Sequence, residues 1–238
     1  MILLNKKRIL FISSIIIYSI FSYSFLENFD LNTILVSSTP VSNHVIILDA
    51  GHGNPDGGAT DKTGNIIESE LNLEIVLKLQ NLLESSNCNI ILTRSDENGI
   101  FEANTHSIRD KKISDMKNRV KIGNNSDADL FISIHMNKLE ESKYSGWQTF
   151  YKNKDKESKK IAQKIQTNLN LFMEKENSRE IKSISGIYLT KNVEIPLVIV
   201  ECGFLSNQKE AYLLNKESYQ DKLAWSIYTG LMDYFKDI

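Results

Sequence analysis

Four short runs of apolar residues divide the chain and predict the strands of a buried sheet. They are HVIILD at 44–49, IILTR at 90–94, LFISIH at 130–135 and LVIVECG at 197–203. Each run is rich in β-branched residues and lacks the polar alternation of a half-exposed strand, which is typical of strands covered on both faces. Two weaker alternating runs, GWQTFYK at 146–152 and GIYLTK at 186–191, are further strand candidates.

Apolar residues at helical spacing fill the segments between these strands. Repeats of three and four residues predict helices over 68–86 and 155–174, and a last helix over about 223–234. Strands that alternate with helices predict an α/β fold: a single domain with a mixed, mostly parallel central sheet and helices on both faces. The polar stretch 95–112 has no clear pattern and is expected to be either a mobile lid or a plain surface insertion.

The N-terminus carries the pattern of an exported protein. Three basic residues at 6–8 precede an uncharged run of 18 residues, which as a helix is near the lower limit for spanning a bilayer. A small-x-small match at 22–24 makes cleavage possible, so removal and retention both stay open. The expected organisation is a signal peptide or membrane anchor at 1–26, a polar linker at 27–43 and a folded domain at 44–238.

Composition narrows the class of protein further. The formal net charge is −2, so the chain has no broad basic surface for nucleic acid. Two cysteines are too few for a disulfide scaffold or a four-cysteine zinc site. Because Cys88 follows a predicted helix and Cys202 lies late in an apolar strand, we expect two buried free thiols rather than a disulfide.

Polar residues of types that catalyse reactions or bind metals follow the ends of the predicted strands. His52 lies in a glycine-rich loop after the first strand, His135 ends the third, and Glu201 lies within the run at 197–203. Glu68 opens the helix that follows the first loop. Because these ends share one rim of an α/β sheet, the residues are expected to meet there. Two histidines and a carboxylate form the ligand set of a catalytic zinc, and a carboxylate within an apolar strand is costly to bury unpaired.

Each histidine also has a plainer explanation. His52 alone is consistent with a turn residue, and His135 alone with a hydrogen-bonded core histidine. His44 begins a strand at the opposite end from His52 and is expected to have no role. His106 lies in the long polar stretch and is close enough in sequence to compete for the rim.

The carboxylates near the first loop leave a similar choice open. Asp56, Asp61 and Glu70 are alternatives to Glu68. Position 68 is favoured because it opens a helix whose apolar stripe faces the sheet, which aims its side chain toward the strand ends. Asn137, two residues beyond a candidate ligand, either supports the site or shapes a turn.

Together these residues resemble a known family. DAGHGNPDGGA at 49–59, Glu68 before an amphipathic helix, SIHMN at 133–137 and VECGFLSN at 200–207 occur in the order typical of zinc-dependent N-acetylmuramoyl-L-alanine amidases of type 3. The resemblance implies that Zn²⁺ is held by His52, Glu68 and His135, and that Glu201 is the catalytic glutamate. Asn54 stands where the family usually has a second glycine, which removes no ligand.

The resemblance implies a reaction as well as a fold. These enzymes hydrolyse the amide between N-acetylmuramic acid and L-alanine in peptidoglycan. The simple leader and the closing segment at 219–235 resemble the sporulation-type members, which strip peptides in the spore cortex before muramic δ-lactam forms. Two rival hypotheses are an inactive peptidoglycan-binding or scaffolding module and another zinc peptidase or amidohydrolase on the same fold. No HExxH motif is present, which excludes the commonest zinc-peptidase arrangement.

The expected partners follow from this substrate. They are peptidoglycan glycan strands with stem peptides, reached outside the cytoplasm, with N-terminal membrane contact and no nucleic acid. Beyond the leader the net charge is about −3, so bulk attraction to an anionic wall is not expected. Anchoring, or an activating protein partner, would then supply local concentration.

Overall fold

The computed structural model describes residues 6–28, 39–173 and 177–237. The chain divides into two units, Met1–Ser37 and Ser38–Ile238. The first contains α1 (Lys6–Asn28). Within the described ranges, no helix is long and apolar enough to cross a membrane. The leader expected at 1–26 stays a prediction, and most of the linker expected at 27–43 lies outside the described residues.

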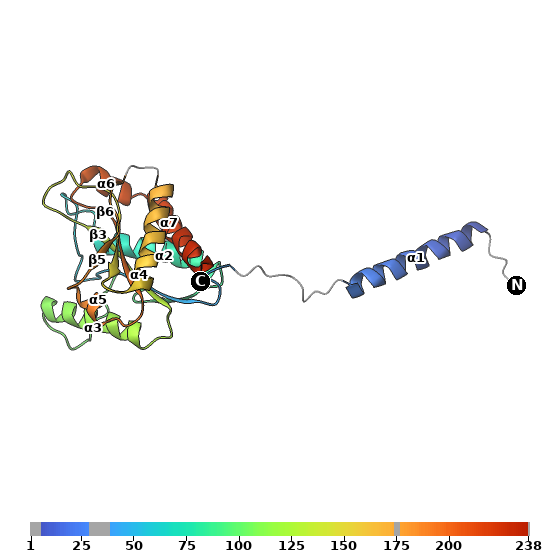
Figure 1. Ribbon diagram of the computed structural model, residues 1–238, viewed down its shortest axis with the longest axis horizontal. Coiled ribbons are helices and arrows are strands. Elements are labelled where there is room, and N and C mark those ends of the chain that lie inside the picture. Colours follow the sequence, from blue (N-terminus) through green and yellow to red (C-terminus); the bar gives the residue numbers. More distant parts are fainter. Residues whose placement is uncertain (1–5, 29–38, 174–176, 238) are drawn as a thin grey trace. The chain divides into compact units, whose positions relative to one another are not determined.

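The second unit, shown with its covering helices in Figure 1, is built on one six-stranded sheet with the order β2-β1-β3-β6-β4-β5. Its strands are β1 (Val45–Ala50), β2 (Asn89–Leu92), β3 (Leu130–Asn137), β4 (Gln148–Lys152), β5 (Lys182–Ile184) and β6 (Leu197–Phe204). The neighbours β2, β1, β3 and β6 are parallel, and β4 pairs antiparallel with β6. The predicted mixed, mostly parallel sheet is therefore confirmed, and four strands end at one edge.

Helices cover both faces of this sheet. They are α2 (Glu68–Glu84), α3 (Ile108–Asn124), α4 (Lys156–Phe172), α5 (Tyr188–Asn192), α6 (Gln208–Leu214) and α7 (Glu217–Lys236). Side chains of α2, α4 and α7 share the larger core cluster with alternate strand residues such as Leu48 and Ile132. The opposite strand positions, Ile47 and Phe131 among them, form a smaller cluster that includes residues of α3 and α5. Burial of such side chains contributes about 1.5–3 kcal/mol each.

The two cysteines lie in this core as free thiols. Cys88 and Cys202 are both buried and are not joined to each other, as expected. Burial raises the pKa of Cys88 to about 12 and raises that of Cys202 further. Neither thiol is therefore suited to react as a thiolate near neutral pH.

Two predictions about local structure are wrong. The run at 186–191 is not a strand: it contains the start of α5, and the strand β5 lies just before it at Lys182–Ile184. Alternation misleads here because Ile187 and Tyr188 are partly exposed rather than packed on a sheet. The stretch 95–112 is not a structureless insertion throughout, since α3 begins at Ile108.

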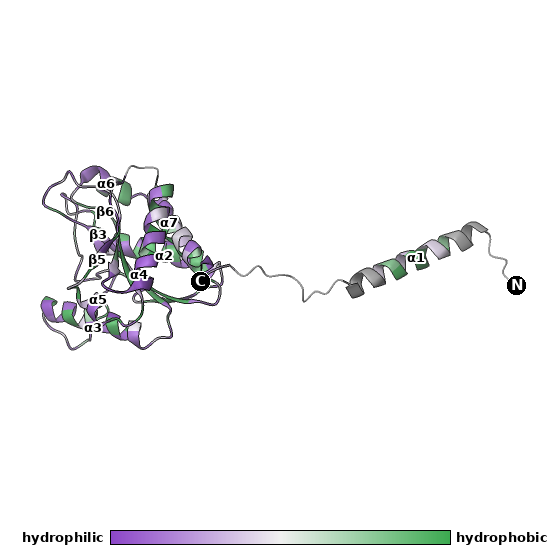
Figure 2. Ribbon diagram, viewed as in Figure 1, coloured by the Kyte–Doolittle hydropathy of each residue, from purple (hydrophilic) through white to green (hydrophobic). Residues whose placement is uncertain are grey.

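The helix α3 escaped prediction because it has almost no apolar stripe. Figure 2 shows hydrophilic residues along much of its length, and two of its apolar residues, Ile108 and Ile113, are exposed. Ser107 caps its first turn by accepting a hydrogen bond from the Asp110 amide at 3.0 Å. Helices of this composition depend on contacts elsewhere in the fold, which a periodicity pattern does not register.

The segment before α3 is tied down on two sides. The Ile100 amide donates to Asp115 Oδ1 at 2.7 Å, and Asn118 Nδ2 donates to the Ile100 carbonyl at 2.6 Å. The Asn54 amide donates to the Glu97 carbonyl at 2.7 Å. These bonds join the segment both to α3 and to the loop after β1, so it forms a wall rather than a free lid.

Candidate active site

The loop after β1 brings a histidine back over the strand ends. His52 has a left-handed backbone with φ 62°, and the neighbouring Gly53 has φ 139°. Gly51 is required for a different reason, because a Cβ placed there would lie 2.3 Å from the His135 ring. At this point the loop and β3 are in direct contact, which brings the two histidine rings to 5.0 Å between centroids.

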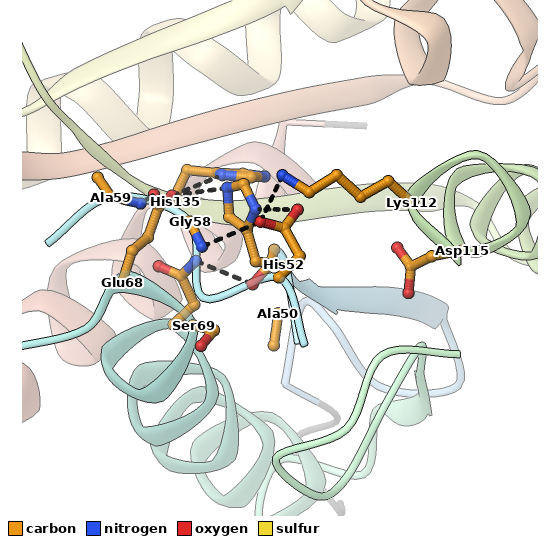
Figure 3. Close-up of polar contacts among 12 residues, drawn as sticks. Ala50, His52, Gly58, Ala59, Glu68, Ser69, Lys112, Asp115 and His135 are labelled. Carbon is orange, nitrogen blue, oxygen red and sulfur yellow. Dashed lines mark hydrogen bonds and ion pairs between the residues drawn. The ribbon is translucent and has the colours of Figure 1, made fainter. Parts of the chain in front are cut away.

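Three side chains converge at this edge (Figure 3). Glu68 Oε1 lies 2.9 Å from His135 Nδ1 and 3.2 Å from His52 Nε2. One ligand atom from each of the three residues lies within 4.8 Å of the others. Glu68 is itself fixed, since it accepts hydrogen bonds from the amides of Ala59 at 2.7 Å and Met136 at 3.1 Å. The structure therefore assembles the three residues that the sequence singled out as ligands.

A second carboxylate orients His52 from outside this group. Asp56 Oδ2 lies 3.0 Å from His52 Nδ1, and Asp56 Oδ1 accepts from Lys112 Nζ at 2.8 Å. Burial opposes charge on the His52 ring, but the contacts with Asp56 and Glu68 outweigh it and raise the pKa of His52 to about 9. The Asp56 contact leaves Nε2 of this histidine facing Glu68, which is the usual support for a metal-bound imidazole.

Glu201 completes the edge from the neighbouring strand. It is the register partner of His135 between the parallel strands β3 and β6, so the two side chains leave the same face of the sheet. Its Oε2 atom is buried and has no hydrogen-bond partner among the described residues. Burial raises the pKa of this carboxyl, and nearby Glu68 adds to the rise while the histidines oppose it. A buried carboxyl with a raised pKa and a free oxygen is suited to a role as general acid or base.

The donor set fits a divalent metal ion. Two imidazole nitrogens and one carboxylate oxygen are the ligands of catalytic zinc sites that keep a fourth position open. Ligand atoms on a tetrahedral zinc are separated by about 3.3 Å when the bonds are about 2.0–2.1 Å. The measured separations of 2.9 and 3.2 Å from Glu68 Oε1 are close to this value.

Two buried arginines hold the backbone of the His52 loop. Arg119 Nη2 donates to the His52 carbonyl at 2.6 Å, and its Nη1 donates to the Ala50 carbonyl at 2.9 Å. Arg94 donates through Nε to the same Ala50 carbonyl at 2.8 Å and through Nη2 to the Gly51 carbonyl at 3.1 Å. The carbonyls of three successive loop residues are thus fixed by guanidinium groups.

One of these arginines, Arg119, forms ion pairs with two buried carboxylates. Arg119 pairs with Asp49 and, through Nε at 2.6 Å, with Asp115. Burial alone would raise the pKa of Asp49, but Arg119 and hydrogen bonds from Ser133 and Thr93 hold it below its ordinary range. The sequence analysis missed this network. The only local signal is the i, i+4 spacing of Asp115 and Arg119, which is common on solvated helices.

The other candidates lie outside the group. His44 contacts Asp129 at 3.0 Å at the start of β1, far from the carboxyl edge. His106 and Glu70 are exposed and do not join the ligand group among the described residues. Asp61 closes a local turn by accepting the amides of Thr63, Asn65 and Ile66. The main-chain carbonyl of Asn137 accepts the Leu205 amide at 2.9 Å, and within the described part of the chain no contact assigns its side chain a role.

A cleft of about 230 Å³ opens beside these residues. His52, His135 and Glu201 line its floor, and α3 and α5 supply its walls. The fold and the site together define an α/β domain with a candidate divalent-metal centre at the carboxyl edge of its parallel strands. This is the position expected of functional sites in such sheets.

Comparison with known proteins identifies the family. The family model Amidase_3, described as N-acetylmuramoyl-L-alanine amidase, matches residues 46–233. The chain belongs to this family and is a peptidoglycan amidase, which confirms the resemblance drawn from its motifs.

Three individual proteins of this kind are similar to the chain over most of its length. The germination-specific N-acetylmuramoyl-L-alanine amidase of Bacillus subtilis is 40% identical over 223 residues, covering 94% of this chain and 92% of that protein. The CwlD amidase from Clostridioides difficile, solved in complex with the GerS lipoprotein, matches with a TM-score of 0.80 and 46% identity over 82% of this chain and 100% of that one. An N-acetylmuramoyl-L-alanine amidase from Clostridium difficile 630 matches with a TM-score of 0.70 and 29% identity over 81% and 97%.

Proposed function

We propose that this amidase is zinc-dependent and cleaves the amide between the lactyl group of N-acetylmuramic acid and L-alanine. In this proposal His52, Glu68 and His135 bind the metal and Glu201 is the general base and acid. The observation that carries it is the unpartnered buried Oε2 of Glu201, on the strand next to three converging ligands.

The chain's own groups account for proton transfer in this reaction. When bound, zinc polarises a carbonyl oxygen and lowers the pKa of water toward about 7. Glu201 accepts the proton of the attacking water and passes it to the departing nitrogen, so that the amide yields a carboxylate and a free amine. Glu68 is held by two amides and His52 by Asp56, which keeps both ligands in place while the substrate enters.

We infer a role in spore cortex maturation, where removal of stem peptides precedes the formation of muramic δ-lactam. The 40% identity with a germination-specific amidase supports it. The complex of the related CwlD amidase with the GerS lipoprotein supports an activating protein partner for this chain. Export through the leader at 1–26, with cleavage or anchoring, places the domain outside the cytoplasm in the same proposal.

The test is mass spectrometry of peptidoglycan digested by the compact unit 38–238, with zinc added or chelated. The proposal expects stem peptides with a free N-terminal alanine, released only with zinc. Glu201→Gln should retain zinc and lose hydrolysis, His135→Ala should lose both, and the exposed Glu70→Gln should change neither. An active Glu201→Gln would contradict the general-base role, and full zinc occupancy in His135→Ala would contradict ligation.

The same experiment separates the rival functions. Release of peptides cut within the stem would indicate a zinc peptidase instead. No product, with zinc bound at one equivalent, would favour a binding or scaffolding module or a requirement for the partner. Repeating the digestion with a purified partner lipoprotein added distinguishes an inactive module from an enzyme that requires its partner.

A further inference from the structure

The cleft beside the metal ligands is apolar on the side formed by α3 and α5. Its walls include Phe101, Ile108, Met116, Ile187 and Leu189. Such walls suit the uncharged faces of a substrate but provide no means of recognising charge. Recognition of charge therefore falls to the few ionic side chains that line the same cleft.

Most of those ionic side chains are already paired. Asp49 and Asp115 both contact Arg119, and Arg119 is buried. Asp56 contacts Lys112 at 2.8 Å and His52 at 3.0 Å. These contacts leave none of the four carboxylate and guanidinium groups free to bind a charged ligand without breaking an existing ion pair.

Lys111 is different. Within the part of the chain that the structure describes, it is the one cation lining the cleft whose ammonium contacts no carboxylate. Its Nζ atom lies 4.7 Å from the centroid of the Phe101 ring. An aromatic face holds an ammonium group in place without neutralising it. The cleft thus presents one positioned, uncompensated positive charge.

We propose that Lys111 binds a free carboxylate of the stem peptide and sets a preference for acidic over amidated stem peptides. The proposal rests on the proposed function, because it takes the cleft to be where the stem peptide lies. A free carboxylate and the corresponding carboxamide differ by one negative charge, so a positioned ammonium group discriminates between them. Lys111 is therefore a specificity residue rather than a catalytic one.

The experiment measures equilibrium binding of two stem peptides that begin with L-alanine and differ only in this group, one acidic and one amidated. Because these peptides lack the cleaved amide, their binding reports the Lys111 contact whether or not the protein hydrolyses anything. We expect the unaltered protein to bind the acidic peptide about tenfold more tightly, the effect of one charge-assisted hydrogen bond.

Three variants separate charge from structure. Lys111→Met keeps much of the length of the side chain over Phe101. This variant should bind the acidic and the amidated peptide about equally, with the affinity for the amidated peptide unchanged. Lys111→Arg should retain the preference. Lys117→Met removes an exposed lysine from the same helix outside the cleft lining and should behave as the unaltered protein does.

Steady-state kinetics on intact muropeptides then supply the second readout. The same tenfold preference is expected in kcat/KM, chiefly through KM, and it should vanish in Lys111→Met. Equal binding of the two peptides by the unaltered protein, or an unchanged preference in Lys111→Met, would overturn the proposal. Failure of the proposed function shows separately, as an absence of zinc-dependent hydrolysis while the difference in binding persists.

Discussion

Replacing Arg119 with methionine tests whether the His52 loop depends on a buried guanidinium. The side chain is only 2% exposed and contacts Asp49, Asp115 and the His52 carbonyl. Methionine preserves much of the apolar stem of the arginine and removes every one of these hydrogen bonds. The substitution therefore isolates the charge and its hydrogen bonds from the packing.

The expected loss in the free energy of unfolding follows from the carboxylate that Arg119→Met leaves unpaired. Asp49 is 1% exposed, and without Arg119 it becomes a buried carboxylate with no cation. Breaking a buried pair by removing one partner typically costs about 3–5 kcal/mol. Domains of this size have a free energy of unfolding of about 5–15 kcal/mol, so a folded but weakened variant is expected.

The pH dependence gives a second signature of the same cause. In the unaltered protein the pKa of Asp49 is depressed, so its contribution to stability is present above pH 4 and is lost as the pH falls into the acid range. Without Arg119, the largest of the influences that lower the pKa of Asp49 is lost while burial still raises it, so this pKa rises. The stabilising contribution of the ionised Asp49 above pH 4 is then reduced, and the deficit of Arg119→Met should shrink as the pH falls into the acid range.

Urea denaturation followed by circular dichroism measures both effects on the unit 38–238. Arg109→Met is the matched control, since it removes an exposed arginine from the same helix and should change the free energy of unfolding by no more than about 0.5 kcal/mol. Arg119→Lys keeps the charge without the planar fork and should fall between the two. A loss of less than about 1 kcal/mol at pH 7.5 in Arg119→Met would refute the view that this ion pair holds the loop.

Three further predictions concern the ligand group. Gly51→Ala should abolish tight zinc binding in equilibrium dialysis, because the added Cβ would lie 2.3 Å from the His135 ring, whereas Gly57→Ala meets only one methyl group, of Ile67 at 3.1 Å, and should bind normally. Asp56→Asn should weaken zinc binding by about 10- to 100-fold, the usual effect of losing a carboxylate behind a metal-bound histidine; affinity unchanged in a competition titration would contradict this. Because the metal-free pKa of His52 is about 9, zinc binding at pH 7.5 should release at least one proton and tighten as the pH rises toward 9. Calorimetry in buffers of different ionisation enthalpy measures that proton, and zero release would contradict the assigned protonation.

The centre of the sheet was predictable because its strands are buried on both faces. Residues such as Ile46, Ile132 and Val198 are fully buried, and continuous burial leaves a continuous apolar run in the sequence. The strand at the β5 edge of the sheet has no such apolar run. The strand β5 has three residues, of which Lys182 and Ser183 are exposed, so nothing distinguishes it from a loop.

The convergence of the candidate site residues was predictable for a related reason. His52, His135 and Glu201 each adjoin or interrupt an apolar strand, where a polar residue needs an explanation, and Glu68 opens a strongly patterned helix. Their convergence follows from the rule that parallel strands share a carboxyl edge. Nothing comparable marks Arg119, because a charged residue on a polar helix is ordinary until the fold shows what the helix covers.

The polar character of α3 has a physical cause in the two roles that its residues play. On its inner side Arg119 holds the His52 carbonyl and Asp115 holds the Ile100 amide, beside the apolar residues of this helix that pack against the smaller core cluster. On the cleft side Lys112 contacts Asp56 and Lys111 lies over Phe101. Because charged residues take up positions on the inner side, the apolar residues of α3 form no continuous stripe that would reveal the helix in the sequence. Its attachment depends on charge and hydrogen bonding, so a change at α3 is transmitted to the backbone of the His52 loop. The element that sequence patterns describe least well is therefore the one that links the cleft to the candidate metal centre.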